Sequence, residues 1–164
     1  MWREILYPLL LAVAITAPIA AGAVMQPPRT VEPRPVTVAA GPACAVELRP
    51  YEWHDLDTAQ GVLRLPYGVS LDASRGVRAI GYDGWEIRSR PGAGVTDEER
   101  RRGRDGLEAL RRLSEGCELW AEPIGGGRYD SFGRPLAALW LRRTATGEWI
   151  ELRAWAVAGG HVRR

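Results

Sequence analysis

The first positions of the chain are almost all apolar, and this pattern differs from everything that follows. A nearly uninterrupted apolar run covers residues 5–25 and contains Ala21-Gly22-Ala23 near its end. About 20 apolar residues can cross a bilayer core, and a small-x-small step is typical of signal-peptide cleavage sites. Residues 1–25 are therefore predicted to be a signal peptide or an uncleaved signal anchor.

A proline-rich stretch separates this segment from the rest of the chain. Residues 26–43 contain five prolines and no periodic pattern, which indicates an extended linker. Residues 44–164 are enough for one domain with one core. This domain is expected to be secreted, periplasmic or anchored to the membrane with the domain outside the cytoplasm, unless an anchor inserts in the reverse orientation. Membrane contact is expected only if the first segment stays uncleaved.

One amphipathic helix is predicted in the middle of the domain. Thr96 and Glu99 form a capping box at its start, and Gly116 is placed where a left-handed residue would end it. Gly103 and Gly106 weaken its first half by roughly 1 kcal/mol each relative to alanine. Leucines recur at three-residue intervals on one face: Leu107, Leu110 and Leu113.

Short β-like runs surround this helix. They lie at 61–65, 69–71, 76–82, 118–124 and 136–141, while 149–155 fits a final strand or a short helix. Residues 66–68 suggest an extended hairpin. Several short strands with one central helix predict an α+β domain or a small barrel.

Composition and charge narrow the class of protein only slightly. Hydrophobic residues make up 46% and charged residues 26% of the chain, as in globular proteins. The formal net charge of +2 is too small to indicate nucleic acid, and the arginine run at 100–112 favours a solvated helix face. Six of the seven tryptophans are expected to build the core: Trp53, Trp85, Trp120, Trp140, Trp149 and Trp155.

The two cysteines leave two alternatives open. In an oxidising compartment Cys44 and Cys117 could form a disulfide, and two buried free thiols fit equally well. Two cysteines and two distant histidines do not make a zinc ligand set. A monomer is expected.

Three polar clusters contain the candidate chemistry: 55–58, then 78–86, then 129–134. Phosphodiester hydrolysis needs a cation held by oxygens, a base for water, and positive charge for the phosphate. Asp57 and Asp83 could supply the oxygens and Glu86 the base. Arg78 and Arg134 could hold the phosphate, because a planar guanidinium meets two phosphate oxygens at once.

In this order the clusters resemble the staphylococcal nuclease family. The family pattern is an Asp-Gly-Asp-Thr turn, an Arg, an Asp-Thr-Pro-Glu step, a helix and an Asp-Lys-Tyr-Gly-Arg hairpin. The corresponding pieces here are Asp55-Leu56-Asp57-Thr58, Arg78, Asp83-Gly84-Trp85-Glu86, the capped helix and Asp130-Ser131-Phe132-Gly133-Arg134. The resemblance covers nearly the whole domain.

The resemblance implies a fold and a site. The fold would be an OB-type five-stranded β-barrel with a helix packed across it, and the activity would be calcium-dependent cleavage of single-stranded DNA or RNA. Asp57, Asp83 and the carbonyl of Gly84 would bind Ca²⁺, Glu86 would be the general base, and two arginines would hold the scissile phosphate: Arg78 and Arg134. DNA or RNA preference, and endo or exo action, stay open.

The chain departs from the family pattern at several positions. Leu56 replaces a glycine, Gly84 and Trp85 replace Thr and Pro, and Phe132 replaces a Tyr. Two other functions are therefore kept. One is a catalytically inactive module of the same fold that binds nucleic acid or protein. The other is a membrane-tethered structural protein with no metal dependence.

Overall fold

A computed structural model describes residues 39–87, 94–124 and 127–163. The chain divides into two units, Met1–Val31 and Glu32–Arg164, and all described residues belong to the second. The predicted signal or anchor segment and the linker up to residue 38 lie outside the described residues. Within the described ranges, no helix is long and apolar enough to cross a membrane.

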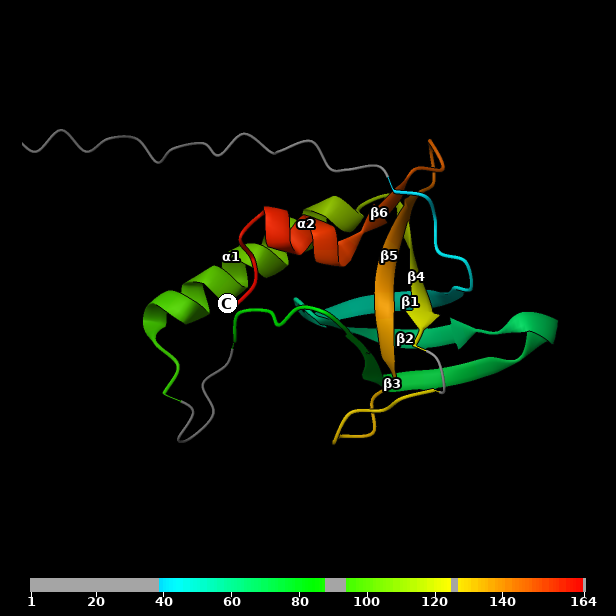
Figure 1. The fold of residues 1–164 in the computed structure, drawn as a ribbon, viewed down its shortest axis with the longest axis horizontal. Coiled ribbons are helices and arrows are strands. Elements are labelled where there is room, and N and C mark those ends of the chain that lie inside the picture. Colours follow the sequence, from blue (N-terminus) through cyan, green and yellow to red (C-terminus); the bar gives the residue numbers. More distant parts are fainter. Residues whose placement is uncertain (1–38, 88–93, 125–126, 164) are drawn as a thin grey trace, which may run out of the picture. The chain divides into compact units, whose positions relative to one another are not determined.

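Five strands form a closed barrel (Figure 1). The antiparallel neighbours follow the order β3-β2-β1-β4-β5, and a parallel pairing of Arg78 and Ala79 with Leu136 and Ala137 closes the ring between β3 and β5. The strands are β1 Val46–Asp55, β2 Thr58–Arg64, β3 Ser70–Ala79, β4 Cys117–Pro123 and β5 Leu136–Arg143. The prediction of an α+β domain with an OB-type five-stranded barrel is confirmed at this level.

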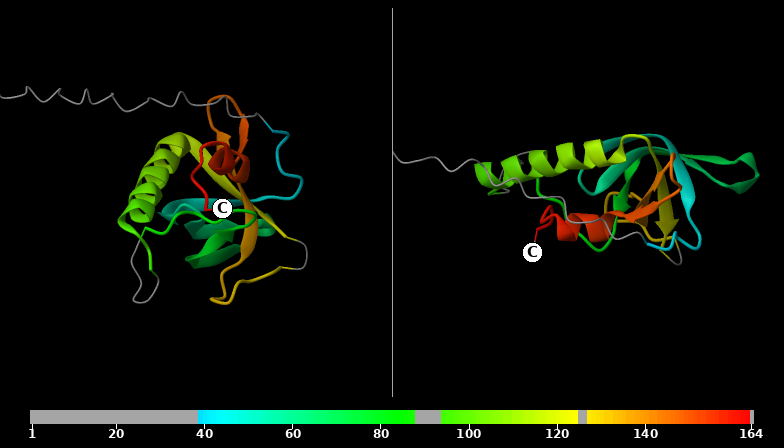
Figure 2. Two further views of the ribbon diagram at one scale, coloured as in Figure 1. Left: turned by 60° about the vertical axis from the view of Figure 1, so that its left-hand side comes forward. Right: turned by 90° about the horizontal axis from the view of Figure 1, so that it is seen from above.

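Two helices complete the domain. Helix α1, Asp97–Ser114, packs against β1 and β4, while β6, Trp149–Glu151, pairs with β5 and leads directly into α2, Leu152–Ala158. The segment 149–155 is thus a strand followed by a helix. Both helices lie at one end of the barrel, opposite the tip of the β2–β3 hairpin (Figure 2).

The ends of α1 follow the local signals in the sequence. The Glu99 N–H donates to Thr96 Oγ1 at 3.2 Å, and the Glu99 carboxylate accepts from the Thr96 N–H at 2.9 Å. Gly116 has a φ of 67° just after the helix, a value that favours glycine. The predicted capping box and C-terminal glycine are confirmed.

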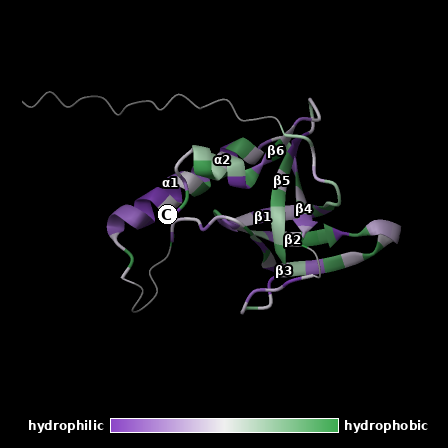
Figure 3. Ribbon diagram, viewed as in Figure 1, coloured by the Kyte–Doolittle hydropathy of each residue, from purple (hydrophilic) through white to green (hydrophobic). Residues whose placement is uncertain are grey.

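The arginine run of α1 faces solvent, as predicted. The first half of this helix is strongly hydrophilic (Figure 3). Arg101 and Arg102 both pair with Glu98, and Arg112 pairs with Glu108. Such exposed pairs along one helix contribute little stability and mainly keep the surface solvated.

Strand β1 was missed in the sequence. Its alternation is interrupted at Pro50, where the pairing with β2 shifts register between Leu48 and Tyr51. Conversely, the runs at 69–71 and 76–82 belong to a single strand, β3. The expected hairpin at 66–68 is confirmed, because the short 3₁₀ turn η1, Pro66–Gly68, connects β2 and β3.

The expectation that tryptophans build the core is wrong for most of them. The interior contains leucine, alanine and valine side chains, and Trp53 is the one tryptophan of the described residues that is fully buried. Trp155 packs against the edge of the core. Because five strands enclose a narrow interior, large indoles fit mainly outside it. The tryptophans of the later strands are half-buried: Trp120, Trp140 and Trp149.

Both cysteines are free. Cys44 is exposed and Cys117 is half-buried, so the disulfide alternative does not describe this structure.

The end of the predicted linker lies on the barrel. The Ala39 N–H donates to the carbonyl of Trp149 at 3.4 Å, and Gly41 lies against the indole of Trp149. Residues 39 and 41 of the predicted linker therefore contact Trp149.

Two helix glycines differ in how closely they approach the rest of the chain. A Cβ on Gly103 would lie 2.7 Å from the carbonyl oxygen of Trp85 and 2.9 Å from that of Glu86. A Cβ on Gly106 would meet only side-chain atoms, at 3.2 Å from Leu56 and 3.4 Å from His161. The backbone at 85–86 can therefore pack on α1 only because residue 103 has no side chain.

Replacing these glycines by alanine should have opposite effects on stability. Both substitutions gain about 1 kcal/mol of helix propensity. In Gly103→Ala a clash with rigid backbone outweighs this gain, so the free energy of unfolding should fall by about 1 to 2 kcal/mol. Gly106→Ala should be neutral or slightly stabilising, because side-chain tips can move. Urea unfolding of the three proteins tests this, and equal effects would contradict the close approach.

Candidate active site

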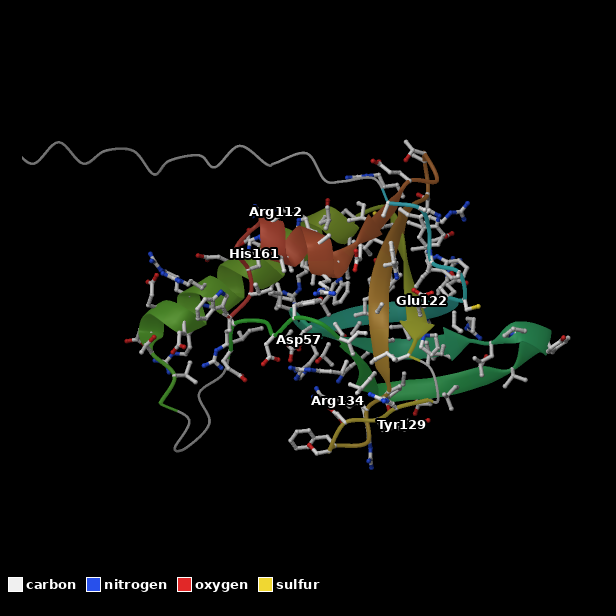
Figure 4. The ribbon with its side chains drawn as sticks, in the orientation of Figure 1. Asp57, Arg112, Glu122, Tyr129, Arg134 and His161 are labelled. Atoms are coloured by element: carbon white, nitrogen blue, oxygen red, sulfur yellow. The ribbon has the colours of Figure 1, made fainter. Side chains whose placement is uncertain are left out.

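A cleft of about 240 Å³ opens beside the barrel, at the end that carries α1. Three parts of the chain line it: the turn between β1 and β2, the end of β3 with the segment after it, and the C-terminal segment. Figure 4 shows Asp57 near the centre of this region. The lining residues are His54, Asp55, Leu56, Asp57, Arg78, Asp83, Gly84, Trp85, Glu86, Ile87 and Arg163.

Asp57 is the buried acid of the cleft, with only 4% of its surface exposed. Its Oδ1 accepts from Arg78 Nη1 at 2.7 Å and from the Thr58 hydroxyl at 3.2 Å. Its Oδ2 accepts from the Gly84 N–H at 2.8 Å. Both carboxylate oxygens are therefore hydrogen-bonded, and three separate segments meet at this one side chain.

The turn that carries Asp57 is held by hydrogen bonds from both sides. The Asp57 N–H donates to Asp55 Oδ1 at 3.2 Å, and the Ala79 N–H donates to the Asp57 carbonyl at 2.7 Å. The Tyr82 hydroxyl donates to the Leu56 carbonyl at 3.1 Å. Burial raises the pKa of Tyr82 further above its usual value, so this hydroxyl stays a donor at all ordinary pH values.

Arg78 connects the two acids that the sequence proposes as metal ligands. Its Nη1 donates to Asp57, and its Nη2 donates to Asp83 Oδ1. Asp83 is exposed, whereas Asp57 is buried. One guanidinium thus holds carboxylates from the β1–β2 turn and from the segment after β3 at the same wall of the cleft.

The surroundings of Asp57 favour its protonated form. Burial, and after it the nearby Asp55 carboxylate, raise the pKa of this carboxyl to about 7, although the Gly84 hydrogen bond and Arg78 oppose the shift. A pKa this high means that the nearby positive charge does not offset the cost of burying the ionised carboxylate. Such a group is typical of catalytic and ion-binding sites.

Gly84 packs tightly against Leu56. A Cβ at residue 84 would lie 2.7 Å from the Cβ of Leu56 and 3.5 Å from Asp57 Oδ2. Leu56 is fully buried, and among the described non-glycine residues only Tyr67 has a positive φ. The turn at Leu56 therefore needs no glycine conformation, while residue 84 has no room for a side chain.

The backbone of Gly84 faces Asp57. Gly84 bridges to Val162 in antiparallel fashion, with the Arg163 N–H donating to the Asp83 carbonyl at 2.9 Å. In this pairing Gly84 directs its own N–H and C=O away from Val162, and the N–H binds Asp57. The Gly84 carbonyl is thus placed on the Asp57 side.

Glu86 lines the same cleft and is half-buried. In the described part of the chain its carboxylate makes no hydrogen bond or ion pair. Its backbone lies against Gly103 of α1, which fixes its position. Among the described residues, Glu86 is therefore the cleft carboxylate without a hydrogen bond or an ion pair.

Arg134 lies beside this cleft and does not line it. Its Nε donates to Asp130 Oδ2 at 2.7 Å, and its Nη1 donates to the Thr58 hydroxyl at 3.1 Å. Since the same hydroxyl contacts Asp57, Arg134 is linked to the site through Thr58. Phe132 packs over its guanidinium, at 5.5 Å from ring centre to Cζ. The structure thus brings four predicted side chains into one cleft and leaves Arg134 at its border.

Asp130 is a residue that sequence reasoning left without a role. Burial works in the opposite direction, but hydrogen bonds from the backbone and side chain of Arg134 and from the Phe132 N–H hold the pKa of Asp130 below its usual value. The sequence signal that could have identified Asp130 is an acid four residues before an arginine, with a turn between them. Tyr82, which supports the turn at Leu56, gave no such signal.

The donors around Asp57 fit a hard cation. Two carboxylates and a backbone carbonyl are oxygen ligands, which calcium prefers, and calcium completes its six to eight ligands with water. No three His, Cys, Asp or Glu side chains gather into a metal-binding group in the ranges that the structure describes. Asp57, Asp83 and the carbonyl of Gly84 are the residues that could hold calcium.

The sequence matches no protein-family model and no curated protein.

The raised pKa of Asp57 predicts how stability depends on pH. An unfolded aspartate loses its proton near pH 4, whereas the folded protein keeps it to about pH 7. Between these values the folded state binds more protons, so the contribution of Asp57 to the free energy of unfolding is full below about pH 4 and is lost as the pH rises through about 7. Asp57→Asn removes this loss.

We expect the stability of Asp57→Asn to improve relative to the original protein by about 3 kcal/mol between about pH 4.5 and about pH 8. The measurement is urea unfolding in chelator at several pH values. A difference that stays constant across this range would contradict the raised pKa.

Proposed function

We propose that this protein is a calcium-dependent nuclease of the staphylococcal nuclease type, which hydrolyses phosphodiester bonds of DNA or RNA. The observation that supports this best is the shared guanidinium of Arg78, which holds Asp57 and Asp83 together in the cleft that Glu86 also lines. Oxygen ligands, a free base and a cation are the parts that this reaction needs.

Glu86 would act as the general base. A base must reach a water molecule in the cleft and must not be occupied by a cation. Glu86 meets both conditions within the described chain, because it lines the cleft and has no ion-pair partner there. The packing of its backbone on α1 fixes the position from which it would accept the proton.

Arg78 and Arg134 would hold the phosphate and stabilise the charge that grows on it. Nε and Nη1 of Arg134 are engaged by Asp130 and Thr58, which orients its remaining Nη2. Removing one such charged contact costs about 3 to 4 kcal/mol of barrier in comparable sites. Calcium, when bound by Asp57, Asp83 and Gly84, would polarise a phosphate oxygen and supply positive charge.

Two departures from the family pattern compensate for each other. The family has a small residue at the position of Leu56 and a larger one at the position of Gly84. Here the large side chain is Leu56, and Gly84 leaves the space into which it packs. The exchange of sizes keeps the two segments in contact, which supports a working site in spite of the changes.

The inactive binding module is the second candidate. Both terminal nitrogens of Arg78 donate to carboxylates, and two aromatic side chains on the β4–β5 connection are exposed and could stack on bases. These are Tyr129 and Phe132, with 62% and 64% of their surfaces exposed. Such a module would bind single strands without cleaving them.

The full chain should cleave single-stranded DNA or RNA in calcium and lose this activity in chelator. Glu86→Gln should lower kcat by about a hundredfold or more, because general-base catalysis contributes at least this much. Rates are measured on labelled oligonucleotides.

Glu108→Gln is the matched control, since Glu108 is an α1 glutamate that does not line the cleft. It should leave kcat unchanged. A folded protein that binds the strand but does not cleave it would overturn the nuclease and favour the binding module. Equal losses in the two variants would remove Glu86 as the base.

A double-mutant cycle should reveal the contact between Leu56 and Gly84. Gly84→Ala should cost about 1 to 3 kcal/mol of stability through overpacking, and Leu56→Gly about 3 to 5 kcal/mol through loss of a buried side chain. The double variant should be more stable than the sum predicts by about 1 kcal/mol or more, because the Cβ–Cβ clash disappears. Strict additivity in urea unfolding would contradict the compensation.

A further inference from the structure

The C-terminal segment returns from α2 to the cleft and is held there by its backbone. Val162 bridges to Gly84, and the Arg163 N–H donates to the Asp83 carbonyl. The indole N–H of Trp85 reaches the Gly160 carbonyl at 3.5 Å. Arg163 therefore lines the cleft from a fixed position next to Asp83, and no sequence motif pointed to it.

The two arginines that line the cleft differ in how far their charge is neutralised. Arg78 contacts two carboxylates and its side chain is 25% exposed. The side chain of Arg163 is 44% exposed, and its one ion pair with a described residue is a 3.5 Å contact with Glu99. The other oxygen of Glu99 is engaged by the capping box. The charge of Arg163 is thus less neutralised by nearby carboxylates than that of Arg78, which leaves Arg163 more able to bind an anionic ligand.

Arg163 and Arg134 belong to different parts of the fold. Asp57 is between Arg134 and the C-terminal segment, which is marked by His161 (Figure 4). The Glu99 contact directs Arg163 toward the start of α1, whereas Arg134 belongs to the connection between β4 and β5. Of these two arginines, Arg163 lines the cleft, whereas Arg134 is paired with Asp130 beside it.

We propose that Arg163 binds a second phosphate of the nucleic-acid strand, adjacent to the phosphate that is cut. This inference rests on the proposed nuclease function. The substrate class would then be strands that place at least two phosphates in the cleft. A terminal phosphate should therefore raise kcat/KM for a short substrate. A guanidinium suits this contact because it meets two phosphate oxygens at once.

The test compares a dinucleotide with a single phosphodiester and the same dinucleotide carrying an added 5′- or 3′-terminal phosphate. The full chain should prefer one phosphorylated form. In Arg163→Gln the ratio of kcat/KM between this form and the unphosphorylated one should fall about tenfold, as expected for one charge-assisted contact. Arg163→Lys should keep part of the preference.

Arg112→Gln is the matched control, because Arg112 also pairs with a glutamate of α1 but does not line the cleft. It should keep the original ratio. A second measurement is the salt dependence of oligonucleotide binding by Glu86→Gln, whose slope should fall by about 0.7 when Arg163→Gln is added.

The outcomes separate the inference from the function on which it rests. Cleavage of DNA without any preference for a terminal phosphate, or a preference and a salt slope unaffected by Arg163→Gln, would overturn the second-phosphate site alone. Failure of the original protein to cleave or bind any of these substrates in calcium would overturn the nuclease and this inference together.

Discussion

The buried carboxylate of Asp57 is the interaction on which the candidate site depends. It accepts from the Thr58 hydroxyl, from Arg78 and from the Gly84 N–H, and its own carbonyl binds the Ala79 N–H. A buried carboxylate without these donors would be very costly. The turn, the end of β3 and the segment after it are therefore constrained together, and a change in one of them displaces the others.

Core packing also fixes the position of the residues proposed for catalysis. Leu56 fills the core beside Asp57, and it occupies the space that Gly84 leaves free. On the far side of the same segment, Gly103 lets the carbonyls of Trp85 and Glu86 lie on α1. The position of Glu86 thus depends on two glycines that have no chemical function. Small residues at these points are a requirement of geometry.

The sequence predicted well what depends on local signals. The capping box at Thr96 and the glycine after α1 gave the helix ends, and turn residues gave the β2–β3 hairpin. It missed β1, because Pro50 interrupts the alternation, and it placed too many tryptophans in a narrow core. Two of the three polar clusters supply the four predicted residues that line one cleft, although their roles stay predictions. Arg163 was missed because its position depends on long-range pairing with Asp83 and Gly84, which no local pattern encodes.

The electrostatics of the cleft oppose the stability of the fold at neutral pH. Two carboxylates share Arg78, and Asp57 keeps a pKa near 7 in spite of three donors. Burial therefore works against its charged form, and the fold is less stable at neutral pH than a neutral side chain would make it. Positive charge supplied by a ligand removes the conflict, because it stabilises the ionised form that the folded chain alone holds poorly.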